Sequence, residues 1–133
     1  MIKYIAVVAV VSAVALSACG ESAGPATISL QAQLANAGAS DRAMLVQIVG
    51  TDTASRIDTV TAPVGSSYTV YAQRQSNTGW RAIIAGNLAN GAVLRLIVPG
   101  KAKASAYSAS ILDVADAVFA DLPAGSRALS VTP

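Results

Sequence analysis

Alternation of apolar and polar side chains with a period of two is the feature of this sequence that most constrains its fold. In the segment Thr27–Leu34, every second residue is apolar and the residues between are Thr, Ser or Gln. Successive side chains of a strand point to opposite faces, so this pattern predicts a strand with one buried face. Further segments of strand character follow, separated by clusters of turn-forming residues: Ala43–Val49, Ile57–Ala62, Tyr68–Arg74, Trp80–Ala85, Ala92–Val98, Ala106–Ala115 and Leu129–Thr132.

Short strands with turns at this spacing predict an all-β fold, a single antiparallel β-sandwich over residues 27–133. The segment Ala43–Val49 is almost continuously apolar, which indicates a strand buried on both faces or central in a sheet. The alanine-rich stretch Ala102–Ala120 has a composition that also suits a helix. Serines interleaved with a period of two favour a strand there. The segment Asp116–Leu122 stays open between a helical turn and a loop with a short strand.

Three of these segments resemble, in their spacing, cohesin-like and related immunoglobulin-like (Ig-like) sandwich modules. They are Ala43–Val49, the strand Gly91–Val98, and the late segment that ends with Ile111–Asp116. Cohesins bind partner proteins and many related sandwiches bind sugars, so the resemblance implies a binding module. It carries no individual binding residue over to this chain, and a fold analogy does not by itself define a function.

The first nineteen residues predict an export signal. Lys3 is the single positive charge of a short leading region, and the apolar run Ile5–Ala15 is interrupted only by Ser12. A helix that spans a membrane needs about 20 apolar residues. This run is shorter and is followed by small residues, which favours a cleaved secretory signal.

The end of that signal, Leu16-Ser17-Ala18-Cys19, resembles the lipobox of bacterial lipoproteins. The resemblance implies cleavage between Ala18 and Cys19, a diacylglyceryl thioether on the Cys19 sulfur and acylation of the new amino terminus. Two or three acyl chains form a stable membrane anchor, whereas one binds reversibly. The implied layout is a signal peptide at residues 1–18, a lipidated cysteine with a flexible tether at residues 19–26, and the sandwich. Because Gly20 and not Asp follows the cysteine, the family rule places the protein at the outer membrane in a host with two membranes, facing the periplasm or the cell surface.

The composition argues against several classes of function. The chain has no histidine and one cysteine, which excludes a Ser-His-Asp or Cys-His catalytic site, a structural zinc site and an internal disulfide. We therefore expect no enzyme and no cofactor beyond the acyl chains on Cys19. The net charge of +2 is too weak to indicate nucleic-acid binding. Asp113, Asp116 and Asp121 lie close together, but their spacing matches no calcium loop, so we expect a solvated loop and no metal site.

Trp80 is the strongest candidate for a binding residue outside the signal. It is the only tryptophan, it follows the polar loop Gln75–Gly79, and Arg81 is next to it. It either fills the core or, together with Tyr71 and Arg81, forms an aromatic platform for a sugar. The sequence thus leaves two functions open for a lipid-anchored envelope protein: a non-catalytic module for a protein partner or envelope assembly, or a carbohydrate-binding module that binds polysaccharide at Trp80. An exposed edge strand such as Thr27–Leu34 would favour the protein partner, through strand addition.

Overall fold

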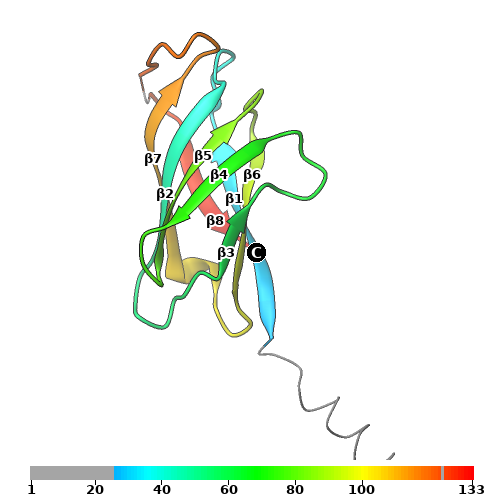
Figure 1. The fold of residues 1–133 in the computed structure, drawn as a ribbon, viewed down its shortest axis with the longest axis vertical. Helices are drawn as coiled ribbons and strands as arrows, with labels where there is room; N and C mark the ends of the chain where they lie inside the picture. The colour runs from blue at the N-terminus through cyan, green and yellow to red at the C-terminus, as the bar shows by residue number, and fades with distance from the viewer. Residues whose placement is uncertain (1–25, 124) are drawn as a thin grey trace, which may run out of the picture.

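Two four-stranded antiparallel sheets pack face to face in the computed structural model, which describes residues 26–123 and 125–133 (Figure 1). The predicted all-β sandwich is confirmed. Its elements are β1 (Thr27–Ala35), β2 (Ala43–Gly50), β3 (Thr59–Thr61), β4 (Thr69–Arg74), β5 (Gly79–Ala85), β6 (Gly91–Pro99), the 3₁₀ turn η1 (Ala104–Ala106), β7 (Tyr107–Ala115) and β8 (Ala128–Thr132).

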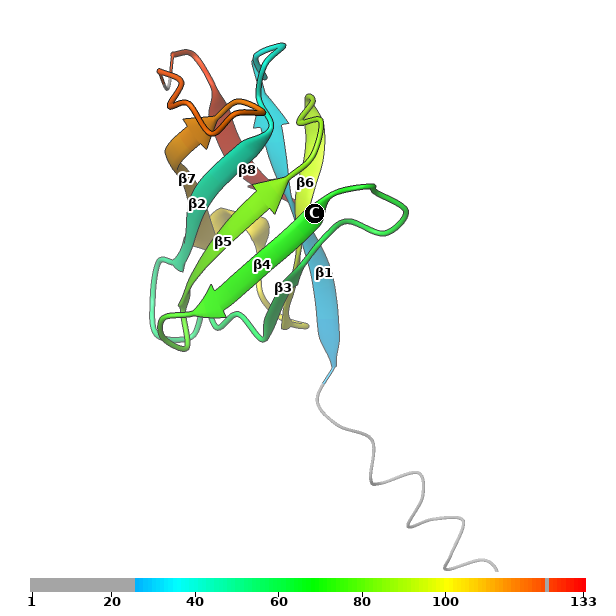
Figure 2. The same ribbon diagram turned by 45° about the horizontal axis from the view of Figure 1, so that its top comes forward.

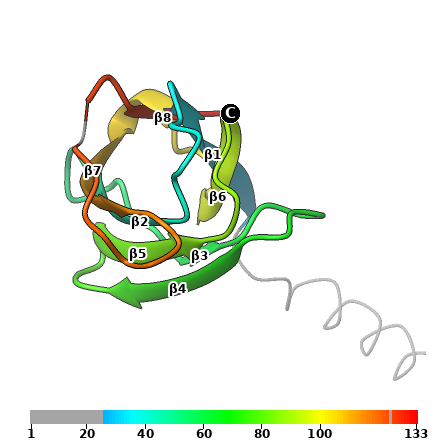
Figure 3. The same ribbon diagram turned by 90° about the horizontal axis from the view of Figure 1, so that it is seen from above.

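The strand order is β3-β6-β1-β8 in one sheet and β4-β5-β2-β7 in the other. Strands pair in a nested way: β1 with β8, β2 with β7, β3 with β6, and β4 with β5. The chain is therefore an antiparallel ribbon doubled over into two layers, which are seen edge-on in Figure 3. One end of the sandwich, here called the entry end, carries the start of β1 and the β2–β3, β4–β5 and β6–β7 connections (Figure 2). The β1–β2, β5–β6 and β7–β8 connections lie at the far end, and the β3–β4 connection projects to one side.

The core lies between the sheets and is built from the inward half of each alternating strand. In β2 the residues Met44, Val46 and Ile48 are buried, while the residues between them are only half-buried. In β6, Leu94 and Leu96 face them from the other sheet and are fully buried. Burial of one face in each sheet is what holds the two layers together.

Three expectations from the sequence need adjustment. The segment Thr27–Leu34 was expected as a possible edge strand, and this is wrong: β1 lies between β6 and β8 in the sheet. Residues Gln31–Leu34 are paired on both sides, which blocks strand addition there, whereas Thr27–Leu30 pair only with β6. Of the segment Ile57–Ala62, only Thr59–Thr61 pairs as a strand. The segment Asp116–Leu122 is a turn with one isolated bridge, between Ala115 and Asp121, and not a helix.

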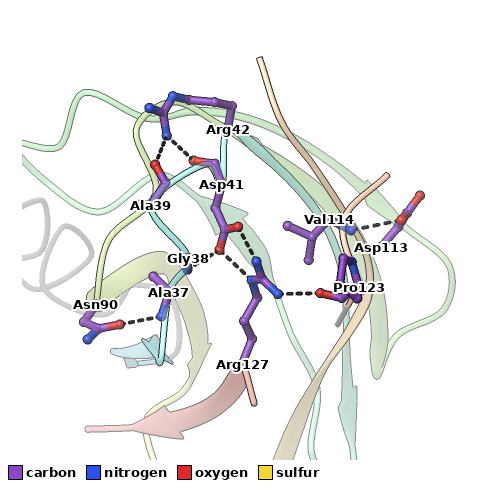
Figure 4. A network of polar contacts seen from close by, with 10 residues as sticks. All are labelled: Ala37, Gly38, Ala39, Asp41, Arg42, Asn90, Asp113, Val114, Pro123 and Arg127. Carbon is purple, nitrogen blue, oxygen red and sulfur yellow. Dashed lines mark hydrogen bonds and ion pairs between the residues drawn. The ribbon is translucent and has the colours of Figure 1, made fainter. Parts of the chain in front are cut away.

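A network of polar contacts ties the loops of the far end together (Figure 4). The Asn90 side chain accepts a hydrogen bond from the backbone N–H of Ala37, across the β1–β2 and β5–β6 connections. The carboxylate of Asp41 is bonded to the Arg127 guanidinium, which joins the β1–β2 connection to the start of β8. These contacts hold the β1–β2, β5–β6 and β7–β8 connections against one another.

Candidate functional site

One row of side chains crosses the whole outward side of the β4-β5-β2-β7 sheet and is mostly apolar. Tyr71 lies opposite Ile83, Ile83 lies opposite Leu45, and Leu45 lies opposite Asp113. Directly opposite residues have Cβ atoms about 5 Å apart, so these side chains are in contact range across the four strands. Tyr71 is 68% exposed and Ile83 is 46% exposed. Large apolar side chains thus cover a face that an isolated sandwich would leave polar.

A hollow of about 310 Å³ lies beside this row, toward the far end. It is lined by the small residues Ala43 and Ala115 and by Leu45, Ile83 and Phe119, among others. Phe119 comes from the β7–β8 connection, which runs over this end of the sheet in Figure 3. We call Leu45, Tyr71, Ile83 and Phe119 the outer patch.

Phe119 is held in solvent by a turn built around Asp116. The Asp116 carboxylate oxygen Oδ1 accepts hydrogen bonds from the backbone N–H groups of Val118, at 3.0 Å, and Ala120, at 2.9 Å. Phe119 has a φ of 61°, in the left-handed region that a residue with a side chain enters at a cost of about 1–2 kcal/mol. It is 84% exposed. A strained, hydrogen-bonded turn that displays an aromatic ring to water is the type of feature found at binding sites.

A polar row lies next to the outer patch on its other side. Arg81 is opposite Gln73 on β4 and Gln47 on β2. A second hollow, of about 270 Å³, is lined by Tyr71, Gln73 and Arg81 together with Leu45 and Ile83. The structure thus brings two of the predicted binding residues, Tyr71 and Arg81, to one hollow.

Trp80 lies on the opposite side of β5 from Tyr71 and Arg81. Its cross-strand partner on β2 is Ile48, which is fully buried, and Trp80 is itself half-buried against the core. Its indole Nε1–H donates a hydrogen bond to the carbonyl oxygen of Ile57, at 3.2 Å. The guanidinium of Arg74 lies 5.4 Å from the centre of the ring, a cation–π distance. The indole N–H of Trp80 is therefore hydrogen-bonded and its ring is covered by Arg74. Trp80 does not share a surface with Tyr71.

The outward side of the other sheet is different in character. Its β1 residues are Ser29, Gln31 and Gln33, and Arg95 of β6 donates to the Ser29 hydroxyl at 2.7 Å. Arg95 is half-buried on this polar face. The two outward faces of the sandwich are thus unequal, and the apolar one is the candidate interface.

Shifted pKa values occur away from the outer patch. A hydrogen bond from Arg127 holds the pKa of Asp41 below its usual value, against the opposing effect of burial. Burial raises the pKa of the Tyr107 hydroxyl. Within residues 26–123 and 125–133, no group of three or more His, Cys, Asp or Glu side chains is placed to hold a metal ion.

The lipobox residues Leu16, Ser17, Ala18 and Cys19 lie outside the described residues. In the part of the chain that the structure describes, no helix is long and apolar enough to cross a membrane. The chain matches no protein-family model, and no curated protein or solved structure matches it significantly.

Sequence reasoning missed Leu45, Ile83 and Phe119 as surface residues. A signal is present in the almost continuously apolar run Ala43–Val49, which predicts a strand buried on both faces or central in a sheet. Strand β2 is central, as expected, but only its inward face is fully buried. In an antiparallel sandwich of two layers, a strand that is apolar on both faces presents one of them to solvent.

Proposed function

We propose that this chain is a lipid-anchored envelope protein whose sandwich binds a protein partner through the outer patch. The observation that carries the proposal is the apolar row Tyr71–Ile83–Leu45, continued by Phe119 on its Asp116-bonded turn. Exposed apolar patches beside polar residues mark interaction sites, and aromatic residues at the centre of a patch contribute most to affinity.

The shape of the patch favours a protein over a sugar. A protein partner would seat an apolar side chain in the hollow that Ile83 and Phe119 line together with Ala43 and Ala115. Rim charges are available for orientation: Arg81 lies on one side of the row and Asp113 at its end. This combination of an apolar centre and a charged rim is the usual anatomy of a protein interface.

The anchor in this proposal rests on the sequence. The lipobox-like Leu16-Ser17-Ala18-Cys19 supports lipidation of Cys19, and the first strand begins at Thr27, a short distance along the chain. The likeness to cohesin-like modules supports partner binding by analogy of fold. Both are consistent with a sandwich that functions by contact near a membrane.

Site-specific photocrosslinking in cells that make the full chain tests the partner proposal. A photoreactive amino acid replaces Ile83 or Phe119 in the outer patch, and Gln31 or Thr132 on the polar outward face serves as the matched control. We expect a discrete crosslinked product from the first pair only, and its loss when Tyr71→Asp is added to the Phe119 probe. Equal products from both faces, or none from the outer patch, contradict the proposal.

A carbohydrate ligand remains a second candidate because of one observation, the hollow that Tyr71 shares with Gln73 and Arg81. An exposed aromatic ring with flanking hydrogen-bond donors is a platform on which a sugar ring can stack. The variants Tyr71→Ala and Phe119→Ala separate the two functions. Sugar binding predicts that glycan retention is lost with Tyr71→Ala and kept with Phe119→Ala, whereas a protein partner predicts that both variants lose the crosslink.

The lipid anchor can be tested independently of the protein partner and of the sugar. The mass of the mature full chain, extracted from membranes, should include the acyl groups, and Cys19→Ala should abolish the added mass and the membrane association. An unmodified Cys19 in the native chain contradicts the anchor.

A further inference from the structure

We propose that the entry end of the sandwich is a docking surface for the anionic phospholipid headgroups of the membrane that holds the chain. This inference rests on the lipid anchor of the proposed function. It concerns a different part of the molecule from the outer patch, and it assigns an orientation to the domain.

The charges of the described residues are divided unequally between the two ends of the sandwich. Arg81, Arg95 and Asp113 lie on the outward faces of the sheets. Of the other charged residues described, the entry end has Arg56, Arg74, Lys101 and Lys103 against Asp52 and Asp58, and the far end has Arg42 and Arg127 against Asp41, Asp116 and Asp121. The molecule is therefore an electric dipole with its positive end at the start of β1.

The two carboxylates at the entry end are already engaged. Asp58 forms an ion pair with Arg56 at 3.0 Å. The Asp52 carboxylate accepts hydrogen bonds from the backbone N–H of Ala54 and from the Ser55 hydroxyl, each at 2.9 Å. Neither acid pairs with the two lysines of the β6–β7 connection.

Lys101 and Lys103 are exposed and have no ion-pair partner among the residues that the structure describes. They lie with Asp52 and Ser55 around an open hollow of about 470 Å³ at this end. Lysine is a point charge on a long flexible stem, so both ammonium groups can reach outward from the sandwich.

The chain enters the sandwich next to these lysines. The backbone N–H of Gly100 donates a hydrogen bond to the carbonyl oxygen of Ala26, at 2.9 Å, so Lys101 is one residue away from the point of entry. A lipid on Cys19 would be joined to this point by Gly20–Pro25, a segment that spans at most about 20 Å. The tether thus delivers the basic end, and not the acidic end, to the membrane surface.

An anionic surface would favour this orientation further. Each lysine near such a surface contributes an attraction that decays within a Debye length, about 8 Å at physiological salt. The tether makes the encounter intramolecular, so two lysines are sufficient to bias the orientation even though they would bind a free domain weakly. With the entry end on the membrane, the Phe119 turn at the far end points away from it, toward the partner.

Energy transfer from Trp80 to a dansyl label on the lipid headgroups tests the proposal. Trp80 is the only tryptophan and lies at the entry end, beside Arg74 and the carbonyl of Ile57. The acylated full chain is reconstituted in vesicles of phosphatidylcholine with or without phosphatidylglycerol. We expect transfer to rise with phosphatidylglycerol, and the rise to be lost at high salt.

The variants separate local charge from net charge. The double variant Lys101→Gln, Lys103→Gln should reduce the rise at least about twofold. The charge-matched control Arg81→Gln, Arg95→Gln, on the two outward faces, should leave it unchanged. Transfer that is independent of lipid charge, or that falls equally in both double variants, overturns the docking surface while the anchor stands. A chain that carries no acyl group and does not float with the vesicles overturns the anchor of the proposed function, and the docking surface with it.

Discussion

Asp41 and Arg127 are 86 positions apart in the sequence and form a two-pronged ion pair: Nε donates to Oδ2 and Nη2 to Oδ1, both at 2.6 Å. Asp41 is fully buried, and its Oδ2 also accepts the backbone N–H of Gly38 at 2.7 Å. Arg127 is the last residue of the β7–β8 connection, which carries Phe119, and its Nη1 donates to the carbonyl oxygen of Pro123. The ion pair therefore fixes one end of the loop that presents Phe119 of the outer patch.

Replacement of Asp41 by Asn should destabilise the fold strongly. The variant removes one charge of a largely buried ion pair, which costs about 3–5 kcal/mol in comparable pairs. Urea unfolding followed by circular dichroism measures the loss. Asp121→Asn, a change of the same chemistry at an exposed position, is the control and should stay within about 0.5 kcal/mol of the parent. A similar small effect for Asp41→Asn would mean that the ion pair contributes little.

Protonation of the Asp41 carboxylate should lower the stability of the fold in acid. Its pKa is lower in the folded chain than in the unfolded one, so the unfolded state takes up the proton first as the pH falls. The stabilisation is complete above the unfolded pKa, about 4, and is lost as the pH falls through the folded pKa. The free energy of unfolding, measured from pH 6 to pH 2, should decline below about pH 4 in the parent. The decline should be shallower in Asp41→Asn, and parallel curves would contradict the prediction.

Ionisation of Tyr107 should lower the stability of the fold at high pH. Its buried hydroxyl donates to the carbonyl oxygen of Arg56 at 2.7 Å, and burial raises its pKa. The unfolded chain ionises first, so this stabilisation is present below pH 10 and is lost as the pH rises above it. Tyr107→Phe should cost about 1 kcal/mol at pH 7 and remove that part of the alkaline decline. Tyr71→Phe, at an exposed position, should change neither quantity.

The strands were predictable because period-two alternation is a local property. Each segment carries its own inward and outward residues, and Thr27–Leu34 and Tyr68–Arg74 match β1 and β4 to within one residue at each end. The order of strands in a sheet is set by contacts between segments far apart in sequence. Thr27–Leu34 has the composition of a half-buried strand at any position, so nothing local indicates that β6 and β8 pair with both of its edges.

The outer patch was less predictable for a related reason. Ile83 and Leu45 are ordinary strand residues, and only their cross-strand register with Tyr71 places them in one row. Phe119 lies in the segment that propensity left open, and its exposure depends on the Asp116 hydrogen bonds. Trp80 was singled out for its rarity, but its environment is set by Ile57 and Arg74, and no local pattern places these two residues beside it.

The cover over Trp80 can be measured directly through its fluorescence. Arg74 lies over the ring, so Arg74→Ala should increase quenching by acrylamide, a neutral quencher that is insensitive to the lost charge. Arg81 is adjacent to Trp80 in sequence but on the other face of β5, so Arg81→Ala should leave the quenching unchanged. Quenching that is already high in the parent, and equal in both variants, would mean that the indole ring is open to solvent. Trp80 would then again be a candidate stacking platform for a sugar. Among the described residues it would be a second exposed aromatic surface beside the outer patch.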